Sequence, residues 1–310
     1  MARKWLDYKT DAWVQWCPGC GDFGILNSIY RAVSELGIDP EELVVVGGIG
    51  CSGRTTYYVK GSNFHALHGR AIPVATGVKL ANPHLNVIVA GGDGDLMGIG
   101  GGHFVALGRR NIDLTVLLYD NAVYGLTKGQ AAPTLPAWIK TKALSSPNIH
   151  DNINPVMLAF AVGFTFIARG YAYHTQQLKE IIKQAVRHKG AALVDILQPC
   201  PTYNNVMTNK WYEERIYYVE DEDPGYDPMI RTPEDFAAKA PSIVSKLLEF
   251  GDKIPLGILY WNQTREPFED RLDKIMPGYK EAPPARRRLD VDGRPFLHPF
   301  DVFKDRLVAP

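Results

Sequence analysis

Four cysteines in a chain of 310 residues are the side chains best suited to bind a soft metal. Cys17 and Cys20 lie three positions apart in "WCPGCG", ahead of the first expected helix. Cys51 in "GIGCSG" and Cys200 in "QPCP" each follow an apolar run typical of a buried strand. Thiolates can bind zinc, bind an iron–sulfur cluster or form a redox disulfide. The pair at Cys17 and Cys20 does not decide among these chemistries.

Two of these chemistries fit the cysteine spacing poorly. A structural zinc site usually combines two close-spaced pairs, whereas this chain has one pair and two distant cysteines. A thioredoxin-like couple needs C-x-x-C at a helix start after a strand, but Cys17 and Cys20 precede every expected strand. The spacing therefore disfavours a zinc site and a redox disulfide, but it does not exclude either one.

A second group of residues suits a hard metal and a diphosphate. Asp93 in "GGDGD" supplies a carboxylate between two glycines, which let the backbone approach a phosphate closely. Asn121 in "DNAVYG" ends the next expected strand, so one strand–helix–strand unit returns the chain beside Asp93. The Asp93 carboxylate, the Asn121 amide oxygen and the Val123 carbonyl would form half of an octahedral Mg²⁺ shell. Diphosphate oxygens and water would complete that shell.

The stretch "GIGCSG" also matches G-x-G-x-x-G, the fingerprint of dinucleotide binding. The residues after Gly53 do not have a helical pattern, and no acid between Gly53 and Asp93 could hold a ribose hydroxyl. A tight glycine turn that presents Cys51 is therefore the favoured interpretation.

The elements that position these residues form an alternating pattern. Continuous apolar runs predict strands, and the segments between them predict helices, which indicates an α/β fold with a parallel sheet covered on both faces. Ligands bind beyond the carboxyl ends of parallel strands, so the loops after the four clearest strands are expected to form one site. The expected strands are 43–48, 86–92, 113–121, 192–198 and 256–261, and the expected helices are 23–36, 71–81, 101–109, 155–162, 175–188 and 233–250.

Composition limits the function class and the cell compartment. The 34 basic and 34 acidic residues cancel, which argues against a nucleic-acid or membrane-surface protein held by bulk charge. No signal-peptide core and no apolar run approaching a membrane span is found, so a cytoplasmic protein is expected. We expect a binding domain over 1–232 and a C-terminal extension over 233–310, with an extended tail from about 275. The tail is expected either to be disordered or to wrap a partner subunit.

The motifs taken together resemble a known family. Gly92–Gly94 followed by 121–125 is similar to the thiamine-diphosphate-binding motif. The stretches "WCPGCG", "GIGCS", "HALHGRAIPVATGVKLANP", "GGDGD", "NAVYGLTKGQ" and "QPCPTYN" resemble, in order, the β subunit of 2-oxoacid:ferredoxin oxidoreductases. The resemblance runs from about Trp16 to Asn204 and implies a thiamine-diphosphate-binding fold.

The resemblance also implies roles for individual residues. Mg²⁺ would be held by Asp93, Asn121 and the Val123 carbonyl. One [4Fe–4S] cluster would be held by Cys17, Cys20, Cys51 and Cys200. The implied contacts to thiamine diphosphate are Ile49, Gly50, Cys51, Ser52, His68, Gly94, Asp95, Gly125 and Leu126.

The implied reaction is coenzyme A-dependent oxidative decarboxylation of a 2-oxoacid, such as pyruvate or 2-oxoglutarate, to acyl-CoA and CO₂. Electrons would pass singly through the cluster to ferredoxin. The cofactor loops offer no carboxylate for the aminopyrimidine N1′, and in the family the α subunit supplies that glutamate, so activity is expected only with this partner. Two alternatives stay open: a non-oxidative thiamine-diphosphate decarboxylase or synthase with structural cysteines, and an electron-transfer module without thiamine.

Overall fold

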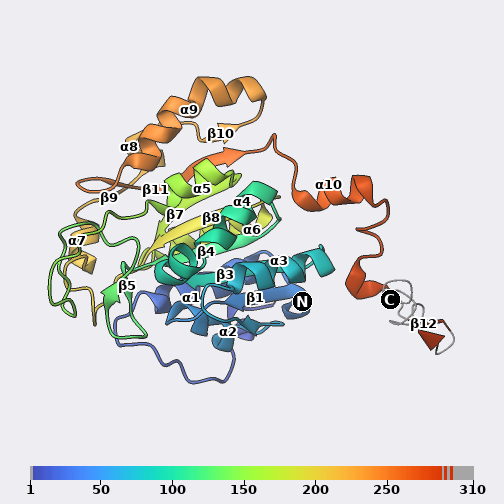
Figure 1. Cartoon of the computed structure of the whole chain (residues 1–310), viewed down its shortest axis with the longest axis horizontal. Coiled ribbons are helices and arrows are strands. Elements are labelled where there is room, and N and C mark those ends of the chain that lie inside the picture. Colours follow the sequence, from blue (N-terminus) through green and yellow to red (C-terminus); the bar gives the residue numbers. More distant parts are fainter. Residues whose placement is uncertain (1–2, 288–289, 292–293, 296–310) are drawn as a thin grey trace, which may run out of the picture.

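The computed structural model describes residues 3–287, 290–291 and 294–295 and has one large sheet at its centre (Figure 1). The strand order is β10-β11-β7-β8-β4-β3-β1-β2, and β9 also pairs with β11. Neighbouring strands from β2 to β7 are parallel, whereas β11 is antiparallel to β7. The strands are β1 (Leu43–Gly47), β2 (Phe64–His65), β3 (Asn86–Gly92), β4 (Thr115–Asp120), β7 (Phe166–Tyr171), β8 (Ala192–Leu197), β9 (Ile216–Tyr218), β10 (Met229–Ile230) and β11 (Ile254–Asn262).

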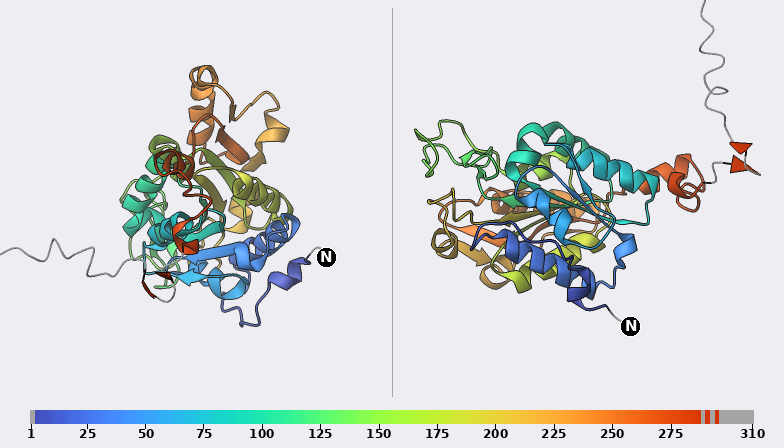
Figure 2. Two further views of the ribbon diagram at one scale, coloured as in Figure 1. Left: turned by 90° about the vertical axis from the view of Figure 1, so that its right-hand side faces the viewer. Right: turned by 90° about the horizontal axis from the view of Figure 1, so that it is seen from below.

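Helices cover both faces of this sheet, as the alternating pattern predicts (Figures 1 and 2). On one face, α1 and α6 pack together over a core that includes Ile29 and Leu178. On the other face, α3, α4, α5 and α9 cover a second core that includes Phe104 and Ile243. These helices are α1 (Asp22–Glu35), α3 (Ala71–Ala81), α4 (Gly101–Arg110), α5 (Pro155–Val162), α6 (Thr175–Arg187) and α9 (Pro233–Leu248).

Shorter elements connect these layers and follow the sheet. They include α2 (Thr55–Tyr58), α7 (Asn209–Glu213), α8 (Val219–Glu222) and α10 (Phe268–Ile275), together with the two-stranded sheets β5 (Val123–Tyr124) with β6 (Gln130–Ala131) and β12 (Asp290–Val291) with β13 (Arg294–Pro295). The segment after Gly53, in the G-x-G-x-x-G match, forms only a 3₁₀ turn and the four-residue α2. It offers no long helix to meet a pyrophosphate.

Strand β7 is the main element that the sequence pattern misses. It lies between β8 and β11, and every one of its residues is buried. Its Arg169 interrupts the apolar run, which hides the strand from a search for hydrophobic segments. Arg169 Nε donates a 2.9 Å hydrogen bond to Oδ2 of Asp195, its register partner in β8. The buried charge is therefore paired across the two strands, as a charge at this depth requires.

The C-terminal segment contributes to the same sheet. β11 lies within the expected extension 233–310 and pairs with β7, so the sheet continues past residue 232. The part of the tail at 288–289, 292–293 and 296–310 lies outside the described residues. Within the described ranges, no helix is both long and apolar enough to cross a membrane.

Candidate active site

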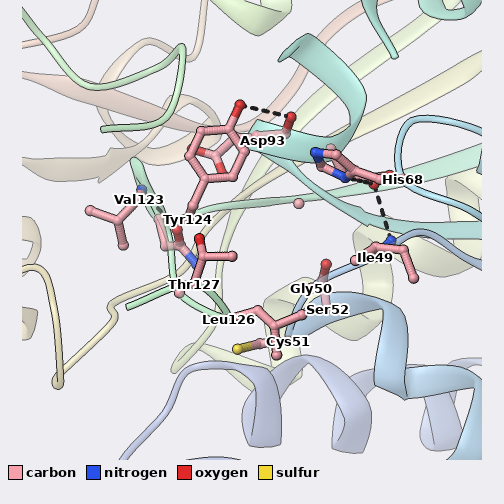
Figure 3. Close-up of a pocket in the computed structure, with 15 residues that line it drawn as sticks. Ile49, Gly50, Cys51, Ser52, His68, Asp93, Val123, Tyr124, Leu126 and Thr127 are labelled. Atoms are coloured by element: carbon pink, nitrogen blue, oxygen red, sulfur yellow. Dashed lines mark hydrogen bonds and ion pairs between the residues drawn. The ribbon is translucent and has the colours of Figure 1, made fainter. Parts of the chain in front are cut away.

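The four loops expected to carry the chemistry meet at one edge of the sheet. Strand register pairs Gly47 with Ala90, Gly92 with Tyr119, and Asp120 with Leu197, so β1, β3, β4 and β8 end close together. A cavity opens beyond these ends, and residues from all sides of it are drawn in Figure 3. Every expected Mg²⁺ ligand and thiamine contact lines this first cavity, together with Gly92, Tyr124 and Thr127.

Asp93 is held in the wall of the first cavity by one of its two carboxylate oxygens. The Ala122 N–H and the Thr134 hydroxyl donate to Oδ2 at 2.9 and 2.5 Å. Both bonds engage the same oxygen, which leaves Oδ1 available to a ligand. Burial raises the pKa of Asp93 to about 6. A divalent cation beside this carboxylate would offset that desolvation.

The turn from Asn121 to Val123 presents the other two expected Mg²⁺ ligands. Ala122 has a φ of 64°, a left-handed conformation that is uncommon for a residue with a Cβ. This turn lets the Val123 N–H donate a 3.0 Å hydrogen bond to Oδ1 of Asn121. A carboxylate, an amide oxygen and a backbone carbonyl are hard donors that suit Mg²⁺, so the donor set fits this ion.

The carboxylate of Asp95 holds two loops of the cavity together. Its Oδ1 accepts hydrogen bonds from the backbone N–H groups of Ile49 at 3.0 Å and Gly69 at 2.8 Å. Nδ1 of His68 lies 2.6 Å from the same oxygen. Because this oxygen accepts two other bonds, we assign the proton to Nδ1 of His68, which leaves Nε2 for a ligand.

Close backbone packing explains the glycines around the cavity. A Cβ on Gly94 would lie 2.3 Å from the ring of Tyr124, whose hydroxyl donates to the Gly94 carbonyl at 3.2 Å. A Cβ on Gly53 would lie 1.7 Å from the carbonyl oxygen of Gly48. The glycine turn around Cys51 is therefore tight, and the missing side chain of Gly94 makes room for the ring of Tyr124.

All four cysteines line a second cavity directly beside the first. The two cavities share Cys51, Asn121, Gly125 and Leu126. The four thiols are free and come from three separate segments of the chain. The loop with Cys17 and Cys20 is anchored by two hydrogen bonds: Trp16 Nε1 donates to the Cys51 carbonyl at 2.8 Å, and the Tyr173 hydroxyl donates to the Gly19 carbonyl at 2.6 Å.

The thiols of this second cavity lie in a low-dielectric environment. Burial raises the pKa of Cys20 and of Cys200, and it raises the pKa of Cys51 to about 11. Within the described ranges, no three His, Cys, Asp or Glu side chains converge on the position of a single metal ion. The cysteines of a [4Fe–4S] cluster bind different iron atoms, so they surround a volume instead of one point. Four thiols around one cavity fit that requirement.

Two protein-family models match this chain. Residues 48–196 match the family described as "Thiamine pyrophosphate enzyme, C-terminal TPP binding domain", and residues 200–276 match the C-terminal region of the "Pyruvate ferredoxin oxidoreductase beta subunit". The chain is 86% identical to "2-oxoacid:ferredoxin oxidoreductase 2, subunit beta" of Aeropyrum pernix, over 100% of both chains. The chain belongs to the family of 2-oxoacid:ferredoxin oxidoreductase β subunits.

Other members of this family support the assignment. The β subunit of the 2-oxoacid:ferredoxin oxidoreductase of Saccharolobus solfataricus is 51% identical over 96% of this chain and 98% of the relative. A solved 2-oxoglutarate:ferredoxin oxidoreductase from Magnetococcus marinus, with 2-oxoglutarate, coenzyme A and succinyl-CoA bound, has a TM-score of 0.82 and 34% identity. That match covers 99% of this chain and 97% of the solved chain. The chain is thus a component of an oxidoreductase complex, and its thiamine-diphosphate-binding fold is confirmed.

Several residues of this β subunit site carry no recognisable sequence signal. Thr134 contacts the expected Mg²⁺ ligand Asp93 through its hydroxyl. Asp22 lines the cysteine cavity beside Cys20, and burial raises the pKa of its carboxyl to about 7. Gln198 is visible in the motif "QPCP" but has no role assigned by spacing. Position beside Cys20 and Cys200 is the only signal that points to Asp22 and Gln198.

Proposed function

We propose that this chain, together with an α subunit, catalyses coenzyme A-dependent oxidative decarboxylation of a 2-oxoacid and delivers electrons singly through a [4Fe–4S] cluster to ferredoxin. Pyruvate and 2-oxoglutarate are the candidate substrates. The observation that carries the proposal is the position of Cys51, which lines both the cavity of the thiamine residues and the cavity of the four cysteines. One residue between the two sites gives electrons a short path from one to the other.

The first cavity would hold thiamine diphosphate and Mg²⁺. When bound, the thiamine supplies an electron sink at the 2-oxo carbon as CO₂ leaves. Asp93, Asn121 and the Val123 carbonyl would hold the cation. Gly94, Asp95, Gly125 and Leu126 would line the diphosphate. Ile49, Gly50, Cys51, Ser52 and His68 would approach the organic rings.

The second cavity would hold the cluster. When bound, the cluster accepts and releases one electron at a time, which a disulfide or a zinc ion does not do. Cys17, Cys20, Cys51 and Cys200 would ligate it. Cys17 is exposed, so its side of the cavity faces the solvent from which ferredoxin would approach.

The α subunit would complete the first cavity. Asp93 and Asp95 are the only acids among the described residues that line it. Asp93 is the expected metal ligand, and Oδ1 of Asp95 already contacts three donors. Oδ2 of Asp95 has no hydrogen-bond partner in the described part of the chain, but it packs against Gly48, where a Cβ would lie 1.9 Å from it. We therefore expect the partner to supply the carboxylate for the aminopyrimidine. The 2-oxoacid and coenzyme A bound to the Magnetococcus marinus neighbour support the same reaction class here.

Anaerobic co-purification with the α subunit tests the proposal. We expect iron and sulfide in the ratio of one [4Fe–4S] cluster per chain, together with thiamine diphosphate, and ferredoxin reduction that requires both a 2-oxoacid and coenzyme A. Colourless protein that releases CO₂ without ferredoxin would indicate the non-oxidative alternative. A complex with iron but no Mg²⁺-dependent thiamine binding would indicate the electron-transfer alternative.

A further inference from the structure

The amide side chain of Gln198 lines the cysteine cavity and contacts Asn121, which lines both cavities. Gln198 follows β8 directly and is 1% exposed. Its Oε1 accepts a 2.6 Å hydrogen bond from Nδ2 of Asn121. Its Nε2 lies 3.3 Å from Sγ of Cys20 and 2.8 Å from the Pro199 carbonyl. One buried amide therefore contacts an expected Mg²⁺ ligand and an expected cluster ligand.

Backbone groups at both ends fix the orientation of this amide. The Val123 N–H can only donate, so the atom of Asn121 that it meets at 3.0 Å is Oδ1. Nδ2 of Asn121 then faces Gln198, which sets the facing atom of Gln198 as Oε1. At the other end, the Pro199 carbonyl can only accept, so Nε2 of Gln198 points toward it. The same Nε2 carries the N–H that is left for Cys20.

Each half of the Gln198 amide has a chemical consequence. Since Nδ2 of Asn121 is held by Gln198, Oδ1 of Asn121 is kept on the side of the first cavity and retains a lone pair for a cation. An N–H directed at a thiolate sulfur stabilises negative charge on that sulfur. Because reduction adds negative charge to a cluster, such a bond favours the reduced state.

We propose that Gln198 is a positioning residue for both cofactors: its oxygen orients the Mg²⁺ ligand Asn121, and its N–H raises the reduction potential of the cluster through Cys20. This inference rests on the proposed function, because it assumes that the two cavities hold the cation and the cluster. It adds a physical link between them that does not depend on Cys51. Packing supports a fixed position for this side chain, since a Cβ on Gly21 would lie 2.9 Å from Cγ of Gln198.

Two substitutions separate the two halves of the role, measured in the αβ complex. Gln198→Met removes both polar atoms from the amide. We expect its Mg²⁺ affinity, measured in the presence of thiamine diphosphate, to fall by about tenfold or more. We also expect its cluster midpoint potential, from an EPR-monitored redox titration, to become more negative. Gln198→Glu keeps an oxygen toward Asn121 but loses the N–H. For Gln198→Glu we expect a Mg²⁺ affinity close to that of the parental complex and a more negative midpoint potential of the cluster.

Thr232→Ala is the matched control, because Thr232 caps the distant helix α9 through its hydroxyl and touches neither cavity. It is expected to lower thermal stability with no change in potential or Mg²⁺ affinity. A Gln198→Met complex with the parental potential and Mg²⁺ affinity would overturn the inference. If Gln198→Met does not assemble, an unchanged potential in Gln198→Glu would overturn it equally. Absence of iron from the unsubstituted complex would instead refute the proposed function.

Discussion

Nδ1 of His68 lies 2.6 Å from Oδ1 of Asp95, a carboxylate whose side chain is 1% exposed. The same oxygen accepts the backbone N–H groups of Ile49 and Gly69, so one buried atom joins the Cys51 turn to the His68 loop. The relative position of two loops that line the first cavity thus depends on a single carboxylate.

Replacing Asp95 tests this dependence. Asp95→Ala leaves two backbone N–H groups without their acceptor, each at a cost of about 1–3 kcal/mol. We expect a lower free energy of unfolding and weaker thiamine diphosphate binding, measured by denaturant titration and by cofactor titration of the αβ complex. Asp95→Asn keeps an acceptor oxygen and is expected to retain most of both. Parental behaviour of Asp95→Ala would contradict the joining role.

Thr134 provides a second test, at the expected Mg²⁺ site. Its hydroxyl donates to Oδ2 of Asp93 at 2.5 Å and lies 2.8 Å from Oδ1 of the buried Asp120. Loss of such an outer contact typically weakens metal affinity by about 10–100-fold. We expect that weakening in Thr134→Val and not in Thr134→Ser, from the Mg²⁺ dependence of thiamine binding. Equal affinities in the two variants would show that the hydroxyl does not orient Asp93.

In the proposed function, Cys51 is the residue that connects the thiamine site to the cluster. Cys51→Ala is expected to lose the visible and EPR spectrum of an intact [4Fe–4S] cluster and nearly all ferredoxin reduction, because one of four thiolate ligands is missing. The measurement compares iron content, spectra and ferredoxin reduction with those of the parental complex. Full ferredoxin reduction with an unchanged cluster spectrum would refute the assignment of Cys51 as a ligand.

The ion pair between Arg169 and Asp195 predicts a large effect on stability. The two side chains are 1% and 0% exposed, and burial raises the pKa of Asp195 even beside the guanidinium. Arg169→Met leaves that carboxyl without its partner, which typically costs about 3–5 kcal/mol. Urea denaturation should show this loss. The double variant Arg169→Met with Asp195→Leu should recover much of it, and a double variant no more stable than Arg169→Met would contradict the pairing account.

His188 predicts how stability depends on pH. It is buried beside Phe166 and Trp261, its Nε2 lies 2.7 Å from the Thr165 hydroxyl, and burial lowers its pKa from 6.5 to about 4. The unfolded chain therefore binds a proton between about pH 6.5 and pH 4 that the folded chain does not. The contribution of neutral His188 to the free energy of unfolding is fully present above pH 6.5 and falls toward pH 4, by about 3 kcal/mol at 1.36 kcal/mol per pKa unit.

The control for this pH dependence is His188→Gln, which keeps a polar group near Thr165 but does not titrate. The difference in unfolding free energy between the parental chain and this variant should shrink as the pH falls from 6.5 to 4. A difference that stays constant over this range would show that His188 does not cause the pH dependence.

Much of the fold could be predicted because its signals are local. The apolar runs of β1, β3, β4 and β8 and the glycine-rich loops after them are visible in short windows of sequence, and α3 and α5 begin and end as expected. β7 is missed because the charged Arg169 interrupts its apolar run. The partner that makes this charge acceptable in the core, Asp195, lies in the neighbouring strand β8. A search for hydrophobic segments reads one short window of sequence at a time, so it cannot detect an ion-pair partner that is distant along the chain.

Some residues of the candidate site could likewise be predicted from the sequence, and others could not. The four cysteines and the glycine-flanked Asp93 stand in short motifs that a reader can find in the sequence alone. Thr134 and Gln198 are ordinary residue types, and their contacts join positions far apart in the chain: 41 residues separate Thr134 from Asp93, and 178 separate Gln198 from Cys20. Only the folded sheet brings these pairs together.

The separation of the four cysteines has a consequence for how the protein is assembled. Cys51 follows β1 and Cys200 follows β8, and two strands, β3 and β4, lie between these two in the sheet. The two thiols therefore share a cavity only after the parallel sheet has formed. In a zinc finger the metal drives folding of an unfolded chain. Here cluster insertion would be a late maturation step that cross-links a finished fold, fastening the N-terminal loop to a sheet that already exists.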